Sequence, residues 1–128
     1  MNEPPMSILL VDDDPSILEI LTDLMAIFGH DYVTARDGVE AIEKLKHSSF
    51  NIVITDMMMP NMDGITMAKK LRETDKSTVI IMVTTEAEKP RIIEAIKSGV
   101  NNYVVKPFTP DTLKAKIDET MKKAAQPA

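Results

Sequence analysis

Acidic, hydroxyl and basic side chains lie at the ends of several short apolar segments of this sequence. Six residues make up the set: Asp12, Asp13, Asp14, Asp56, Thr84 and Lys106. Clustered carboxylates cannot all stay ionised at neutral pH unless a cation joins them. Because the set contains only oxygen ligands, with neither Cys nor His, it favours Mg²⁺. A carboxylate beside Mg²⁺, a lysine and a threonine hydroxyl suits phosphoryl transfer, since the carboxylate can become an aspartyl-phosphate and the cations neutralise the transferred group.

Five short apolar segments predict the strands that position this set. They span residues 8–11, 31–34, 52–55, 79–83 and 103–105, and the second is the weakest. Three of them are rich in Val and Ile without polar alternation, which is typical of strands buried on both faces.

Apolar residues at helical spacing predict a helix after each strand. Asp14 before Pro15, and Thr109 before Pro110, each indicate an N-cap followed by a proline in the first turn. Asp37 with Glu40 resembles a capping box for the second helix, and Asp63 can cap the third, with Gly64 allowing the chain to turn. The fourth helix is expected to start near Glu88, which keeps Pro90 in its first turn. Gly29 and Gly99 are expected to end the first and fourth helices.

The alternation of five strands and five helices indicates an α/β fold, a (βα)₅ parallel sheet with helices on both faces. Ligands of such sheets bind at the carboxyl ends of the strands. If the first and third strands are neighbours, three or four carboxylates converge at one point, where Lys106 and a metal ion offset the charge of Asp56.

Composition limits the possible functions. A chain of 128 residues predicts one domain, and the absence of cysteine excludes disulfides and thiolate metal sites. The longest fully apolar run, residues 79–83, is too short to span a membrane, and residues 1–7 lack the pattern of a signal peptide. These features favour a cytoplasmic protein, and a net charge of −5 disfavours nucleic acid as a partner.

The methionines and histidines have structural interpretations. Met57, Met58 and Met59 could suggest a soft-metal site, but methionine more often fills irregular gaps, so we interpret them as packing residues. His30 and His47 have no partners at ligand spacing and are expected at the surface.

Four motifs resemble the receiver domain of two-component response regulators, most closely the single-domain chemotaxis regulators of the CheY type. They are ILLVDDD, ITDMMMPNMDG, IIMVTTEAEK and NNYVVKPFT, and the similarity runs from about Ser7 to Lys123. The resemblance implies a single receiver domain over residues 1–128, a doubly wound sheet of order 2-1-3-4-5, and phosphorylation by a histidine kinase. It implies no enzyme activity beyond self-catalysed phosphorylation and dephosphorylation.

The resemblance also assigns roles residue by residue. Asp56 matches the phosphoacceptor, Thr84 the hydroxyl that moves onto the phosphoryl group, and Lys106 the lysine of the site, which is followed by a cis peptide bond to Pro107. The metal ligands it implies are Asp13 directly, Asp12 largely through water, Asp56, and the backbone carbonyl of Met58. Met58 and Glu86 flank the path of hydrolytic water.

For output, the resemblance implies a surface formed by the fourth helix, the fifth strand and the fifth helix. Its residues are Ile92, Ile96, Tyr103, Val105 and Lys116, with Tyr103 changing rotamer on phosphorylation. The apolar stripe of the fourth helix, from Ile92 to Ile96, is wider than one sheet-facing side requires. The implied partners are a chemotaxis-type kinase, a flagellar motor switch protein or another target, and possibly a phosphatase; neither nucleic acid nor a membrane is expected, and the protein should be monomeric.

Alternative functions remain. Glu119 occupies a position where the chemotaxis type often has lysine, so a receiver of a non-chemotaxis phosphorelay is the first alternative. A phosphatase of the haloacid-dehalogenase type would carry a second acid where this chain has Met58. A flavodoxin-like FMN carrier would need a Ser/Thr/Gly loop where this chain has three aspartates, which would repel the phosphate.

Overall fold

A five-stranded parallel sheet forms the centre of the molecule, with the strand order β2-β1-β3-β4-β5. The computed structural model describes residues 5–85 and 89–125. The strands are β1 (Ser7–Val11), β2 (Asp31–Ala35), β3 (Ile52–Thr55), β4 (Val79–Thr84) and β5 (Asn102–Val105). All four neighbouring pairs are parallel. The predicted α/β fold class and strand order are confirmed, with each strand within one residue of its predicted bounds.

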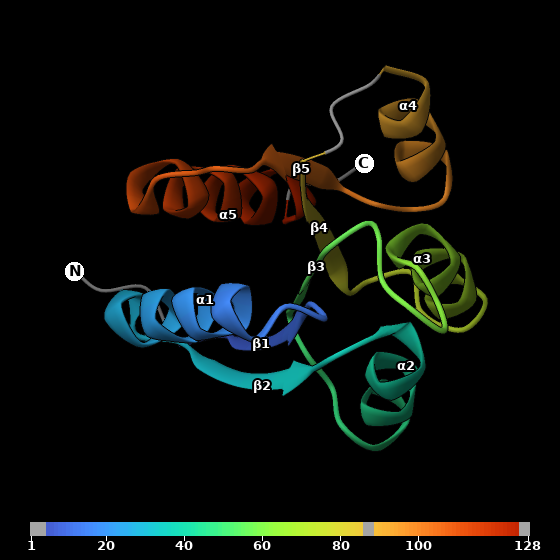
Figure 1. Ribbon diagram of the computed structural model, residues 1–128, viewed down its shortest axis with the longest axis horizontal. Helices are drawn as coiled ribbons and strands as arrows, with labels where there is room; N and C mark the ends of the chain where they lie inside the picture. Colours follow the sequence, from blue (N-terminus) through green and yellow to red (C-terminus); the bar gives the residue numbers. More distant parts are fainter. Residues whose placement is uncertain (1–4, 86–88, 126–128) are drawn as a thin grey trace.

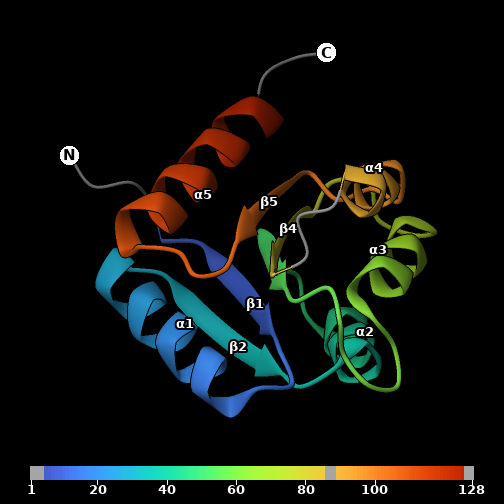
Figure 2. The ribbon, with the colours of Figure 1, turned by 45° about the horizontal axis from the view of Figure 1, so that its top comes forward.

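Helices cover both faces of the sheet (Figure 1, Figure 2). They are α1 (Pro15–Phe28), α2 (Gly38–His47), α3 (Gly64–Arg72), α4 (Lys89–Lys97) and α5 (Pro110–Ala124). One apolar cluster joins the sheet to α2, α3 and α4, and the other joins it to α1 and α5. Because alternate strand residues point to opposite faces, β1 sends Leu9 into the first cluster and Leu10 into the second.

Local capping explains where the helices begin. The side chains of Asp14, Asp37, Asp63 and Thr109 each accept a hydrogen bond from a backbone N–H in the first turn of the following helix, as predicted. In the predicted capping box, the Glu40 carboxylate would also turn back towards Asp37. It lies 3.3 Å from Lys44 Nζ and 3.7 Å from Arg36 Nε.

The end of α1 and the place of Pro90 in α4 also agree with the sequence. Helix α1 ends at Gly29, which has a left-handed backbone (φ 83°). Helix α4 begins at Lys89, so Pro90 lies in its first turn, where no helical hydrogen bond is lost. The expected start at Glu88 lies just outside the described residues.

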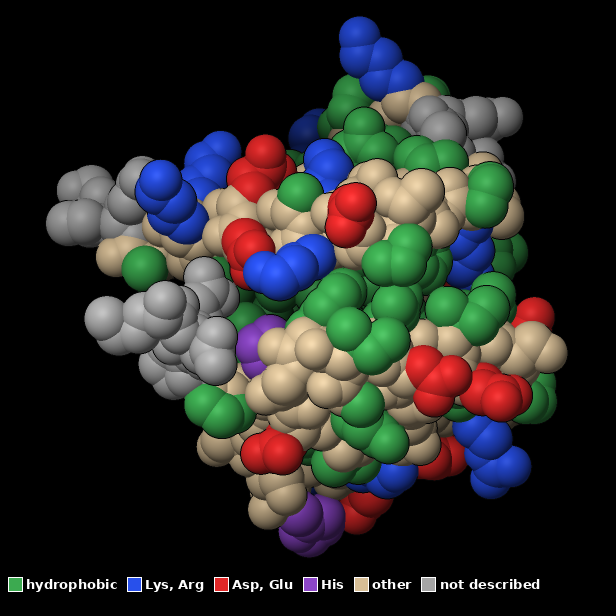
Figure 3. Space-filling view, turned by 90° about the vertical axis from the view of Figure 1, so that its left-hand side faces the viewer, with side chains coloured by type: hydrophobic (Ala, Val, Ile, Leu, Met, Phe, Trp, Pro, Cys, Tyr) green, Lys and Arg blue, Asp and Glu red, His purple; other side chains and the backbone are tan. Residues whose placement is uncertain are grey.

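The molecular surface mixes charges of both signs. On the face shown in Figure 3, hydrophobic side chains gather near the centre, and acidic and basic side chains are interspersed around them. Among the described residues, no helix has the length and apolar character needed to cross a membrane.

Candidate functional site

Three carboxylates meet where the connections after β1 and β3 leave the sheet. The backbone N–H of Asp12 donates to Ala35 O at 3.1 Å, and that of Asp56 donates to Val11 O at 2.9 Å. These bonds extend the strand pairing by one residue and hold both aspartates at the sheet edge. Carboxylate oxygens of Asp12, Asp13 and Asp56 all lie within 4.8 Å of one another. The predicted convergence at the carboxyl edge of the sheet is therefore confirmed for three acids.

Asp14 does not join this cluster through its side chain. Its carboxylate accepts from the N–H of Ser16 at 2.9 Å and caps α1. Its own backbone N–H donates to Asp12 Oδ1, also at 2.9 Å. Asp14 therefore supports the cluster through its main chain, while its side chain starts the helix.

Lys106 places its ammonium between two of the acids. Its Nζ lies 3.2 Å from Asp12 Oδ2 and 3.4 Å from Asp56 Oδ1. The side chain of Lys106 is 14% exposed and that of Asp12 only 1%, so these charges are largely removed from water. The Lys106 N–H donates to Thr84 O at 2.9 Å, and the bond from Lys106 to Pro107 is cis, as the resemblance implied.

The cluster carries more negative than positive charge. Burial raises the pKa of the Asp56 carboxyl, and the charge of Asp12 raises it further. The Lys106 ammonium and a hydrogen bond from the N–H of Met57 act in the opposite direction without cancelling the rise. Three carboxylates with one ammonium, supplying oxygen ligands only, suit a divalent hard cation such as Mg²⁺.

The loop after Asp56 is held against the cluster by a close backbone approach. Gly64 N–H donates to Met57 O at 2.9 Å, and a Cβ at Gly64 would lie 2.3 Å from Asp56 O. The sequence indicated that Gly64 lets the chain turn, but its φ is not in the left-handed region. Space for the Asp56 carbonyl is what this position requires, and only the tertiary structure shows it.

The three consecutive methionines differ in environment. Met57 is fully buried, and Met59 packs against the cluster that α2, α3 and α4 cover. The packing interpretation is wrong for Met58, whose side chain is 61% exposed because the loop carries it away from the core. Its sulfur accepts a hydrogen bond from Arg91 Nη2 at 3.7 Å, a contact between this loop and α4 that no sequence pattern indicated.

Thr84 ends β4, the strand next to β3, and its side chain is buried. Strand β4 also pairs with β5, which leads into Lys106. Asp56, Thr84 and Lys106 therefore lie at the ends of three adjacent strands, as the sequence predicted. Glu86 lies outside the described residues.

The residues expected on the output surface come from α4, β5 and α5. Lys116 Nζ lies 5.8 Å from the centre of the Tyr103 ring, within the range of a cation–π contact. Ile96 is 47% exposed and Val105 41% exposed, while Ile92 is half-buried. In α4 only Ala95 is buried among the described residues, and the stripe residues Ile93 and Ile96 are exposed.

The histidines are not ligands of this site. His30 Nδ1 accepts from the N–H of Met6 at 3.1 Å, and His30 is half-buried rather than fully at the surface. The exposed His47 lies 3.1 Å from Glu43 one helical turn away. The surface expectation therefore holds for His47, and His30 is partly exposed.

The fold and site together define a doubly wound α/β protein with an acidic centre at the point where successive connections leave opposite faces of the sheet. Residues 8–118 match the family model of the response regulator receiver domain. The chain belongs to this family.

Relatives and solved structures agree with this membership. A chemotaxis protein CheY homolog of Campylobacter jejuni is 44% identical over 120 residues, covering 91% of this chain and 92% of the relative. Chemotaxis protein CheY1 of Helicobacter pylori is 44% identical over 117 residues, covering 88% and 94%. The structure of chemotaxis response regulator CheY4 of Vibrio cholerae superposes with a TM-score of 0.87 at 33% identity, covering 91% and 99%. The chain is thus a receiver domain homologous to chemotaxis response regulators.

Proposed function

We propose that this receiver domain is a phosphorylation-dependent switch in which Asp56 accepts a phosphoryl group from a phosphohistidine of a histidine kinase. A carboxylate oxygen of Asp56 bonds to phosphorus while the bond from phosphorus to the histidine nitrogen breaks, and that nitrogen keeps the electron pair. The position of Lys106, 3.4 Å from Asp56 Oδ1, is the observation that supports this proposal most strongly. Its ammonium is fixed where negative charge develops on the transferred group.

The carboxylates of Asp12, Asp13 and Asp56, with the backbone carbonyl of Met58, would hold a magnesium ion. The excess of carboxylates over ammonium groups in the cluster is the property that fits a divalent cation. When bound, Mg²⁺ supplies positive charge that neutralises oxygens of the transferred group. In this proposal Asp12 is also the residue that keeps Lys106 oriented, through their 3.2 Å contact.

Loss of the phosphoryl group is self-catalysed in this proposal, and Thr84 stabilises the phosphorylated state through its hydroxyl. The exposed Met58 side chain offers no hydrogen bond donor that could orient a water molecule for attack on phosphorus. Without an acid or base at that position, the chain lacks the second carboxylate on which a phosphatase of the haloacid-dehalogenase type relies. Met58, with Glu86, is expected to set the lifetime of the phosphorylated form.

Intact-mass analysis after incubation with Mg²⁺ and acetyl phosphate tests the phosphoacceptor. Wild-type protein should gain one phosphoryl group, and Asp56→Asn should gain none, because an amide cannot act as the nucleophile. Asp23→Asn, a change at an exposed aspartate of α1, is the matched control and should be labelled like wild type. Labelling of Asp56→Asn at the wild-type level would refute the assignment.

We further propose that the α4–β5–α5 surface, defined by Ile92, Ile96, Tyr103, Val105 and Lys116, binds the output partner. Its exposed Ile96 and Val105, beside the Lys116 ammonium, make it partly apolar and partly basic. The chemotaxis names of the two relatives favour a flagellar motor switch protein as this partner. Glu119 accepts from Asn102 Nδ2 at 3.0 Å and adds an acid to α5, so a target outside chemotaxis is the alternative.

Titration with an amphipathic target helix tests this surface. Beryllofluoride-loaded protein should bind the helix at least about fivefold more tightly than unloaded protein, the lower range of typical coupling between two sites. Ile96→Ala should weaken the binding, whereas Ile27→Ala, at an isoleucine of α1 that is 75% exposed, should leave it unchanged. Equal affinity of loaded and unloaded protein would exclude this surface as the phosphorylation-dependent output site.

A further inference from the structure

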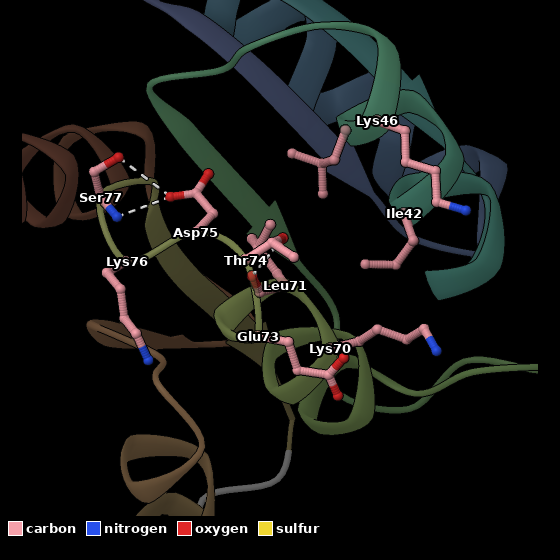
Figure 4. Close-up of a pocket in the computed structure, with 10 residues that line it drawn as sticks. Ile42, Lys46, Lys70, Leu71, Glu73, Thr74, Asp75, Lys76 and Ser77 are labelled. Atoms are coloured by element: carbon pink, nitrogen blue, oxygen red, sulfur yellow. Dashed lines mark hydrogen bonds between the residues drawn. The ribbon is translucent and has the colours of Figure 1, made fainter.

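A cavity of about 650 Å³ opens between the second half of α2, the end of α3 and the turn that follows α3. Apolar side chains of both helices line it: Ile42 and Leu45 are half-buried, and Leu71 is buried. In Figure 4 the Ile42 side chain points across the cavity towards Leu71. The volume falls within the range of small-ligand pockets, and the floor of the cavity is apolar.

The wall formed by the α3–β4 turn is held in place by its own hydrogen bonds. The Asp75 carboxylate accepts from the N–H and hydroxyl groups of both Ser77 and Thr78. These bonds lower the pKa of Asp75 to about 2. Arg72 ties the same turn to the segment after α4, because its guanidinium donates to the carbonyls of Asp75 and Gly99. The cavity is therefore preformed and does not depend on a ligand to shape it.

Lysines outnumber acidic residues around the opening. The amino groups of Lys46 and Lys70 extend on one side of the cavity, and that of Lys76 on the other (Figure 4). Two acids, Glu73 and Asp75, also line it, and the lowered pKa of Asp75 keeps that carboxyl negatively charged. The three ammonium groups therefore exceed the two carboxylates by one positive charge. A ligand with an apolar centre and negative charge on both sides would complement this arrangement.

We propose that this cavity is a docking site for an acidic peptide segment of a partner protein. An apolar side chain of the segment sits on Ile42, Leu45 and Leu71, and carboxylates on either side of it pair with the lysines. Each exposed ion pair contributes little by itself. The buried apolar side chain supplies affinity, and the lysines on opposite sides of the opening select the acidic flanks.

The cavity lies at the amino-terminal ends of the strands, whereas Asp56 lies at their carboxyl-terminal ends. Its turn leads into the start of β4 at Val79, whereas the acidic cluster lies beyond the other end of the strands, near Thr84. Five residue steps along the strand correspond to about 16 Å. Binding should therefore not depend on phosphorylation, and the cavity would hold a partner in both states of the switch.

A synthetic peptide with two leucines flanked on each side by two glutamates, acetylated and amidated, is the probe for this site. In ¹H–¹⁵N spectra of the full chain, the peptide should shift the amides of α2 and of the α3–β4 turn saturably. The double variant Lys70→Glu/Lys76→Glu should bind at least about fivefold more weakly, because two attractive charge pairs become repulsive. Lys69→Glu/Lys97→Glu carries the same change in net charge away from the cavity, and it should bind within about twofold of wild type.

Two further experiments test which peptides the cavity selects and whether binding depends on phosphorylation. A peptide with lysine in place of each glutamate, or with serine in place of each leucine, should not produce the shifts. Beryllofluoride-loaded and unloaded protein should bind the acidic peptide with equal affinity. Because the cavity does not include Asp56, this test does not depend on whether Asp56 is the phosphoacceptor. No saturable shift up to about 1 mM peptide, equal binding of the lysine peptide, or shifts confined to α4, β5 and α5 would each overturn the proposal.

Discussion

Replacing Lys106 by methionine is expected to lower the free energy of unfolding at pH 7 by about 3 kcal/mol, since removing one partner from a buried ion pair typically costs 3–5 kcal/mol. The substitution leaves the carboxylates of Asp12 and Asp56, which are 1% and 14% exposed, without a positive charge beside them. Methionine retains most of the volume of the lysine stem, so the loss comes chiefly from charge. Chemical denaturation in EDTA measures the change.

The pH dependence of this variant distinguishes charge from packing. Lys106 lowers the pKa of Asp56, so without it that pKa should rise further above its ordinary value of 3.8. A carboxyl with a raised pKa in the folded state binds protons that the unfolded chain has released, and stability then falls as pH rises through this window. The deficit of Lys106→Met should therefore shrink as the pH falls towards 4.

Two comparison variants complete the test of Lys106. Lys114→Met breaks an exposed pair with Asp118 and should cost less than about 1 kcal/mol. Adding Asp12→Asn to Lys106→Met should restore part of the lost stability, because one uncompensated carboxylate is removed. A Lys106→Met protein as stable as wild type at pH 7, or a deficit unchanged between pH 4 and pH 7, would contradict the electrostatic role of this lysine.

Asp56→Asn is expected to be more stable than wild type at pH 7 in EDTA, in addition to losing phosphorylation. Carboxylate oxygens of Asp56 and Asp12 lie within 4.8 Å of one another, and two like charges about 5 Å apart repel by about 3 kcal/mol at an effective dielectric constant of 20. Because Lys106 offsets part of this repulsion, we expect a gain of about 1–2 kcal/mol. Asparagine keeps an oxygen that can accept the N–H of Met57, so the loop should be retained.

The sign of this effect also follows from the raised pKa of Asp56. Between its ordinary pKa and the raised folded value, the folded wild type binds more protons than the unfolded chain and loses stability as pH rises. The advantage of Asp56→Asn should therefore be greatest near pH 7 and should vanish as the pH falls below the ordinary pKa of 3.8, where the carboxyl becomes protonated in both states. Thermal unfolding of wild type, Asp56→Asn and the control Asp23→Asn between pH 4 and pH 7 measures this difference in stability. An Asp56→Asn protein less stable than wild type at pH 7 would contradict the prediction.

Local features of the fold could be predicted from the sequence because the interactions that create them lie within a few residues. Short Val- and Ile-rich segments became β3 and β4, since such segments fit a sheet buried on both faces. Asp63 caps α3 through the N–H of Thr66, only three residues away. The position of the acids at the ends of strands, and hence the chemical character of the site, was likewise visible in the order of the residues.

The assembly of the site depended on which strands are neighbours. Lys106 and Asp12 are separated by 94 positions in the chain, and they meet because β1, β3, β4 and β5 lie in that order with a fixed register. The sequence predicted that Lys106 offsets Asp56, but it could not show that the same ammonium lies slightly closer to Asp12. That sharing decides how much negative charge remains for a metal ion.

Close approaches and exposed surfaces were decided by the tertiary structure alone. The sequence contains three similar methionines, yet only the path of the loop leaves Met58 in solvent while Met57 is buried. Gly64 is required by the Asp56 carbonyl that faces it, a contact across the loop that residue types do not encode. The lysine-rimmed cavity exists because α2 and the turn after α3 pack side by side, and packing between distant segments depends on shape and register rather than on local sequence preference.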